Sequence, residues 1–123
     1  FQVDIEFRDS WKIVKRWVTD ETLAPVSTWF SQERYLCLNG CIDYSNPLYD
    51  EPCTAETWRE IHDTLPDPEE SYPCCYLGLH VWLDKGLVST KVKMHPILIR
   101  GCWIHSTTRN GSGNGGLTLV GFV

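Results

Sequence analysis

The sequence predicts a mainly β fold, an antiparallel sheet or β-sandwich with one short helix in a disulfide-stapled insertion. Three observations predict it: apolar and polar residues alternate along several segments, one segment has helical spacing, and six cysteines are present. Alternation places every second side chain on the same face of a strand. A chain of 123 residues has the usual length of one domain, so we expect a single disulfide-stabilised domain over residues 1–123.

Two strands are expected at the start of the chain. Residues 1–7, FQVDIEF, alternate without interruption and predict a half-buried antiparallel strand. Residues 11–18 follow in a similar phase and predict a second strand paired with the first. The strand is the favoured interpretation, although Trp11, Val14 and Val18 would also suit one stripe of a helix.

The central part, residues 26–74, is expected to be a less regular insertion that carries four of the cysteines. Within it, residues 26–40 are left open, although Gly40 could end a helix there. Residues 54–65 predict the single helix, because Thr54 is a suitable N-terminal cap and Trp58 belongs to an apolar face. The prolines of the following PDPEE segment should end this helix.

Four further strands are expected in the last part of the chain, at residues 76–83, 87–94, 97–104 and 117–123. The first two should form a hairpin around a turn at residues 84–86, DKG, which has typical turn residues. Residues 106–116, STTRNGSGNGG, are rich in glycine and predict a long flexible loop before the final strand.

All six cysteines are expected to be paired in disulfides. They are Cys37, Cys41, Cys53, Cys74, Cys75 and Cys102. An even number of cysteines in a short chain is typical of secreted or cell-surface domains. Cys74 and Cys75 should bond to different partners, since neighbouring side chains on extended backbone point to opposite faces. The cysteine spacing does not match a zinc site, so no metal is expected.

An extracellular location follows from the same interpretation, either as a secreted protein or as the ectodomain of an anchored one. No run of apolar residues approaches the ~18 needed to span a bilayer, so we expect no direct membrane insertion. The sequon at residues 110–112, NGS, predicts N-glycosylation at Asn110. A formal net charge of −5 disfavours nucleic acid as a partner, because phosphate binding needs clustered Lys and Arg.

The motifs of common enzymes are missing, so the sequence favours a protein without catalytic activity. No serine lies in a GxSxG elbow, and no cofactor motif predicts a cofactor. Secretory phospholipases have a cysteine pair followed after two residues by a catalytic His-Asp; here the pair is followed by a longer spacing, and His80 precedes Val81. A small secreted hydrolase remains an alternative, because two acids need only meet in space.

The binding residues predicted from the sequence are Tyr76, His80 and Trp82. On a strand, these three oppose the apolar stripe of Leu77, Leu79, Val81 and Leu83, which has the phase to cover a core. If they are exposed, their aromatic rings would serve as anchors at a protein interface. The sequence therefore predicts a secreted or cell-surface module that recognises an extracellular protein, with a lectin-like glycan-binding domain as a further alternative.

Overall fold

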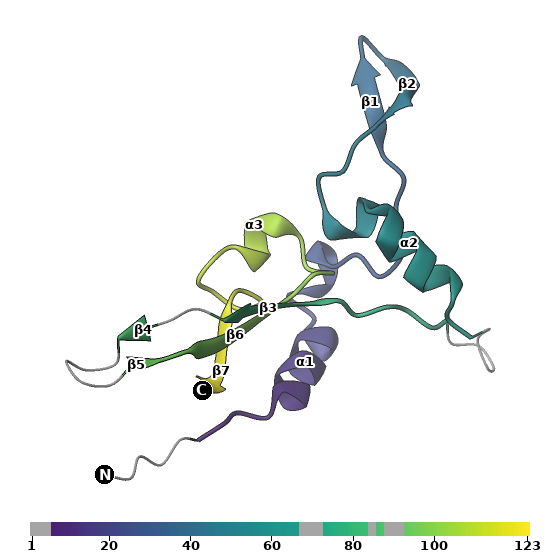
Figure 1. Cartoon of the computed structure of the whole chain (residues 1–123). Coiled ribbons are helices and arrows are strands. Elements are labelled where there is room, and N and C mark those ends of the chain that lie inside the picture. Colours follow the sequence, from purple (N-terminus) through teal and green to yellow (C-terminus); the bar gives the residue numbers. More distant parts are fainter. Residues whose placement is uncertain (1–5, 67–72, 84–85, 88–92) are drawn as a thin grey trace. The chain divides into compact units, whose positions relative to one another are not determined.

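The computed structural model describes residues 6–66, 73–83, 86–87 and 93–123. It divides into two compact units: unit 1 combines Phe1–Ser27 with Leu79–Val123, and unit 2 is Thr28–Gly78. Short helices and small antiparallel sheets alternate along the chain, as Figure 1 shows. Unit 2 closely matches the insertion predicted at residues 26–74. A single domain over the whole chain stays a prediction.

Unit 1 contains a three-stranded antiparallel sheet in the order β3-β6-β7, formed by Leu79–Leu83, Pro96–Gly101 and Thr118–Phe122. Two short strands, β4 (Gly86–Leu87) and β5 (Lys93–Met94), pair with each other. The predicted antiparallel arrangement is confirmed, but the predicted hairpin of residues 76–83 with 87–94 is wrong, because β3 pairs with β6. The predicted turn at 84–86 is wrong at Gly86, which pairs with Met94; its other two residues lie outside the described part.

Helix α1 spans Ser10–Thr19, where the sequence favoured a strand. The Asp9 side chain accepts hydrogen bonds from the backbone N–H groups of Trp11 and Lys12, at 2.9 and 3.3 Å. This cap satisfies two of the amides that the first turn of a helix leaves unpaired. The helical alternative, left open by the sequence, is therefore correct, although its buried residues are Ile13, Val14 and Trp17. Most of the strand predicted at 1–7 lies outside the described residues.

The core of unit 1 is built around two tryptophans, Trp17 and Trp103, which are both about 1% exposed. Their ring centroids lie 6.3 Å apart at an interplanar angle of 62°, an edge-to-face arrangement that aromatic pairs prefer. Gly101 makes room for this packing, because a Cβ atom there would lie 2.9 Å from the Trp103 ring. Strand β6 ends at Gly101, three residues before the predicted end.

A short helix follows each core tryptophan in the sequence: the 3₁₀ helix η1 (Ala24–Val26) after Trp17, and helix α3 (Ser106–Arg109) after Trp103. Helix α3 occupies part of the segment predicted to be a flexible loop, so that prediction is wrong there. The helix is capped by His105 and held by Arg109, whose Nη1 donates to the carbonyl oxygen of Ile104 at 2.9 Å. These contacts fix the residues that precede β7.

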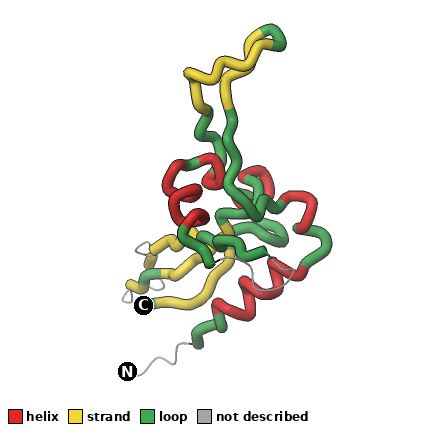
Figure 2. The backbone as a smooth tube through the Cα atoms, turned by 90° about the vertical axis from the view of Figure 1, so that its right-hand side faces the viewer, coloured by secondary structure: helices red, strands yellow, loops and turns green. Residues whose placement is uncertain are grey.

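Unit 2 contains a β-hairpin, in which β1 (Tyr35–Leu38) pairs with β2 (Cys41–Pro47). The sequence left the first of these strands undecided. Asn39 and Gly40 form the connection with φ angles of 51° and 77°. Two consecutive positive φ angles define the type I′ turn, which matches the twist of a two-residue hairpin. Figure 2 shows the two strands running side by side to this turn, beyond the helical part of the unit.

The helical part of unit 2 consists of the 3₁₀ helix η2 (Pro52–Thr54) and helix α2 (Glu56–Asp63). The helix predicted at residues 54–65 is confirmed, but its predicted cap is wrong. Thr54 Oγ1 donates to the carbonyl oxygen of Glu51 at 2.7 Å and so belongs to η2. Trp58 is buried on α2 and packs edge to face against Tyr76, with ring centroids 4.8 Å apart.

The predicted disulfide framework is contradicted, because all six cysteines, each within the described residues, are free thiols. The register of the hairpin explains why Cys37 and Cys41 are not bonded to each other. Cys37 pairs with Ile42 and Cys41 with Leu38, so the two sulfur atoms lie on opposite faces of the ribbon. Cys102 belongs to unit 1, while the other five cysteines belong to unit 2. The predicted β-sandwich is also not seen among the described strands, which form sheets of two or three strands.

Among the described residues, no helix combines the length and the apolar character that crossing a bilayer requires.

Candidate functional site

The most exposed apolar surface of unit 2 lies on the β1–β2 hairpin. We call it the hairpin surface, and it consists of Cys37, Leu38, Cys41, Ile42 and Tyr44. Leu38, Ile42 and Tyr44 are 62%, 53% and 71% exposed. Single exposed apolar side chains are common on proteins, but a contiguous group on one projecting element is typical of an interaction site.

Both faces of the hairpin contribute to this surface. Cys37 lies opposite Ile42, and Leu38 lies opposite Cys41. Directly paired residues share a face, and neighbouring residues alternate between faces. One face therefore carries Cys37 and Ile42, and the other carries Leu38 and Cys41. All four side chains are exposed, so neither face at the turn serves as a core.

Two tyrosines stiffen the hairpin away from its turn. Tyr35 and Tyr44 pack edge to face, with ring centroids 5.2 Å apart at 61°. The Tyr35 hydroxyl donates to Glu33 Oε2 at 3.1 Å. This hydrogen bond raises the pKa of Tyr35, because the phenolate form would lose the bond and face a carboxylate. Tyr35 therefore remains uncharged at neutral pH.

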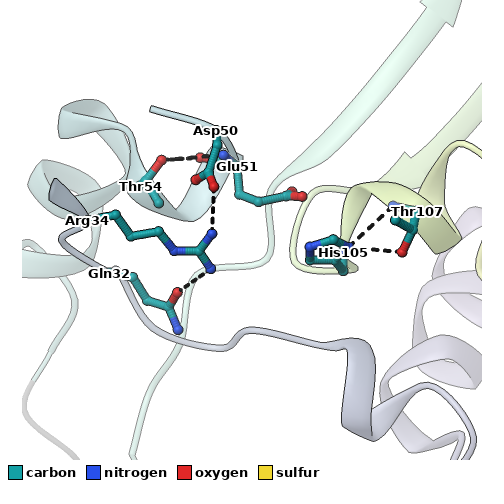
Figure 3. A network of polar contacts seen from close by, with 7 residues as sticks. All are labelled: Gln32, Arg34, Asp50, Glu51, Thr54, His105 and Thr107. Carbon is teal, nitrogen blue, oxygen red and sulfur yellow. Dashed lines mark hydrogen bonds and ion pairs between the residues drawn. The ribbon is translucent and has the colours of Figure 1, made fainter. Parts of the chain in front are cut away.

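The base of the hairpin is held by ion pairs, which Figure 3 shows in part. Arg34 Nη1 lies 2.7 Å from Asp50 Oδ2, and Arg34 Nη2 donates to Gln32 Oε1 at 3.0 Å. Arg59 forms an ion pair with Glu33. A hollow of about 20 Å³ lies among these residues, which is room for about one water molecule. The hollow therefore does not suit a small-molecule substrate.

The sequence contains a clear signal for this hairpin that the periodicity analysis missed. Asn-Gly between two apolar pairs, Cys37-Leu38 and Cys41-Ile42, is the usual signature of a two-residue type I′ hairpin. Gly40 was instead considered as the end of a possible helix. Recognising the turn would have placed the exposed residues on both sides of it.

A second exposed surface lies on β3 in unit 1, where all five residues are exposed. Leu79, Val81 and Leu83 were predicted to cover a core, and this prediction is wrong: Leu83, for example, is 63% exposed. The core of the unit is formed instead by α1 together with residues 99–104. Strand β3 pairs with β6, which contributes Ile99 to that core.

The three predicted binding residues are divided between the two units. His80 and Trp82 lie on the same face of β3, and Trp82 is 48% exposed. Arg100 Nε donates to His80 Nδ1 at 3.0 Å, which requires an unprotonated Nδ1. Tyr76 belongs to unit 2, where it packs against Trp58.

The predicted glycosylation site, Asn110, is exposed at the C-terminal end of α3. Its Oδ1 accepts a hydrogen bond from Arg100 Nη1 at 2.6 Å, so the side chain already has a structural role. Nearby, His105 Nδ1 lies 3.0 Å from Thr107 Oγ1 (Figure 3). N-glycosylation of Asn110 stays a prediction.

An open hollow of about 540 Å³ in unit 1 is lined by Phe7, Arg8, Asp9, Lys12, Ile13 and Arg16. Three cations face one acid, which favours anions, although exposed charges of this kind are strongly screened by salt. Arg8 is already bound to β7 through its backbone and its side chain. The described residues contain no group of three or more His, Cys, Asp or Glu placed to hold a metal ion.

The free thiols lead to a prediction that differs from the disulfide framework. Under denaturing conditions without a reductant, we expect an alkylating reagent to modify six cysteines. In the native protein, the exposed Cys37, Cys41 and Cys74 should react first. Burial raises the pKa of Cys53, Cys75 and Cys102 and so lowers their thiolate fraction.

Mass spectrometry of the alkylated protein measures both the number of modified cysteines and the order in which they react. Protein treated with a reductant before denaturation is the control and should give the same count of six. A lower count without reductant than with it would show that cysteines are paired, against the structure.

Comparison of the chain with family models, curated proteins and solved structures found no match.

Proposed function

We propose that this chain is a protein-binding module and that the hairpin surface is where it contacts its partner. The observation that carries the proposal is the exposure of apolar side chains on both faces of a hairpin with a well-defined turn. A rigid, preformed element loses little conformational entropy on binding. Aromatic and aliphatic side chains on such an element are the usual anchors of protein interfaces.

Charge defines the kind of partner. Residues 35–58 contain four acids, Asp43, Asp50, Glu51 and Glu56, and no Lys or Arg. Hydrogen bonds from the Ser45 and Asn46 side chains and the Ser45 amide lower the pKa of Asp43, so the hairpin itself carries a fixed negative charge. We therefore expect a partner with an apolar groove and a basic rim. An anionic membrane surface would repel the same hairpin.

The test is selection from a displayed library of random peptides on the immobilised protein. The enriched peptides should be apolar and basic, and Ile42→Ser should weaken their binding about 30-fold, since an interface anchor is worth about 2 kcal/mol. Trp11→Ser is the matched control, because Trp11 is 64% exposed in unit 1. Peptides that bind Ile42→Ser as well as the unchanged protein would show that the hairpin is not the binding surface.

A second candidate is a glycan-binding domain, because the Tyr35–Tyr44 pair offers an exposed ring for stacking on a sugar. The same variants separate the two candidates. Tyr44→Ser should abolish glycan binding while Ile42→Ser should not, whereas both should weaken binding to a protein. The extracellular location was inferred from disulfides, which the structure contradicts, and it stays a prediction from the sequence.

A further inference from the structure

Strand β3 is an edge strand of the three-stranded sheet in unit 1. It pairs with β6 on one side, and no strand in the described residues pairs with its other side. Strand β7, at the other edge of the sheet, has additional hydrogen bonds from Arg8. The Arg8 amide donates to the carbonyl oxygen of Val120 at 2.8 Å, and Arg8 Nη1 donates to the carbonyl oxygen of Leu119 at 3.1 Å. Among the described residues, the outer edge of β7 is therefore partly covered, whereas no strand pairs with the outer edge of β3.

The features that usually protect an edge strand are missing from β3. Proteins protect such edges with Lys, Pro or a β-bulge, or keep the edge strand very short. The sequence of β3, LHVWL, contains no Lys, Arg, Asp, Glu or Pro. Its pairing with β6 runs through all five residues without a register shift, whereas the β6–β7 pairing has one. The edge is therefore regular, apolar and able to accept another strand.

The sequence of β3 is complementary to itself. In an antiparallel pair centred on Val81, Leu79 of each chain lies opposite Leu83 of the other, and Val81 lies opposite Val81. These residues share one face, as they do in the observed pairing with β6. On the other face, His80 of each chain lies opposite Trp82 of the other. Every cross-strand pair in this arrangement is apolar or aromatic, and none brings like charges together.

We propose that two copies of this chain associate through their β3 strands, antiparallel and with a twofold axis at Val81. A twofold interface uses the same patch on both subunits, which is the arrangement that a self-complementary strand provides. The two sheets then form one continuous sheet in the order β7-β6-β3-β3-β6-β7. This proposal uses different residues from the hairpin surface, so it stands or fails independently of the proposed function.

The small area of the β3–β3 interface limits the affinity of the dimer. Five strand residues extend about 17 Å, and a contact confined to one edge buries less than the standard protein interface. We therefore expect a weak dimer with a dissociation constant on the order of 100 µM. Sedimentation velocity over about two orders of magnitude in concentration around that value should show conversion from monomer to dimer.

Substitutions at the twofold axis test the geometry. Val81→Lys and Val81→Asp should each abolish the dimer, because each places two like charges opposite each other. An equimolar mixture of the two variants should restore association, because the charges across the axis are then opposite. Leu117→Lys is the control: Leu117 is a similarly exposed residue outside β3, and its substitution should leave the dimer unchanged.

Far-ultraviolet circular dichroism establishes that each variant is folded. Three outcomes would overturn the proposal: an unchanged protein that stays monomeric at every concentration, a folded Val81→Lys variant that still dimerises, or two folded variants whose mixture stays monomeric. None of these outcomes bears on peptide binding by the hairpin surface, which is measured separately.

Discussion

Replacement of Trp17 by alanine is expected to lower the free energy of unfolding by about 3–5 kcal/mol, the usual cost of removing a buried tryptophan. Trp17 is about 1% exposed and packs edge to face against Trp103. Its removal leaves a large cavity between α1 and the segment after β6, and that segment is constrained by the Arg109 hydrogen bonds. Urea unfolding followed by circular dichroism measures the change.

Trp11→Ala is the matched control for this prediction, since it makes the same substitution in the same helix at a side chain that is 64% exposed. We expect a change within about 0.5 kcal/mol, as for most surface substitutions. A double-mutant cycle with Trp103→Ala should show coupling, because the two rings are in contact. Equal costs for Trp11→Ala and Trp17→Ala would contradict the position of α1.

Replacement of Trp58 by alanine should destabilise unit 2 by about 3 kcal/mol or more. Trp58 is 5% exposed on α2 and contacts Tyr76. Its Nε1 is buried and has no hydrogen-bond partner in the described residues, and an unsatisfied buried donor is costly.

Trp58→Phe separates these two contributions. Phenylalanine keeps most of the apolar contact and removes the unsatisfied N–H group, so we expect it to cost much less than alanine. Thermal unfolding of both variants provides the comparison. A phenylalanine variant as unstable as the alanine variant would show that the indole nitrogen makes a stabilising contact.

Periodicity in the sequence correctly predicted the elements in which a single period dominates. Strand β7 and helix α2 appear where apolar residues repeat with one spacing only. Residues 11–18 fit both spacings, and the outcome depends on Asp9, whose side chain stabilises the first turn of α1. Asp9 lies outside this window of residues, so a period calculated over the window gives it no weight.

The exposed surfaces were harder to predict because exposure depends on tertiary structure. The alternation of β3 correctly placed His80 and Trp82 on one face, but it did not reveal that the opposite stripe is exposed as well. Tyr76 was assigned to the same strand, whereas β3 begins at Leu79 and Tyr76 packs in the other unit. The cysteine count also predicted pairing that the hairpin register prevents for Cys37 and Cys41.

The chain order of the two units has a consequence for biosynthesis. Unit 2 is one continuous stretch, while unit 1 is assembled from residues on both sides of it. On the ribosome, unit 2 is therefore complete while more than half of unit 1 has not yet been made. Helix α1 is synthesised early, but Trp17 packs against Trp103, which is synthesised much later. At roughly 5–20 residues per second, the interval between the two residues is several seconds. During that interval the apolar face of α1 is exposed to chaperones and to other nascent chains.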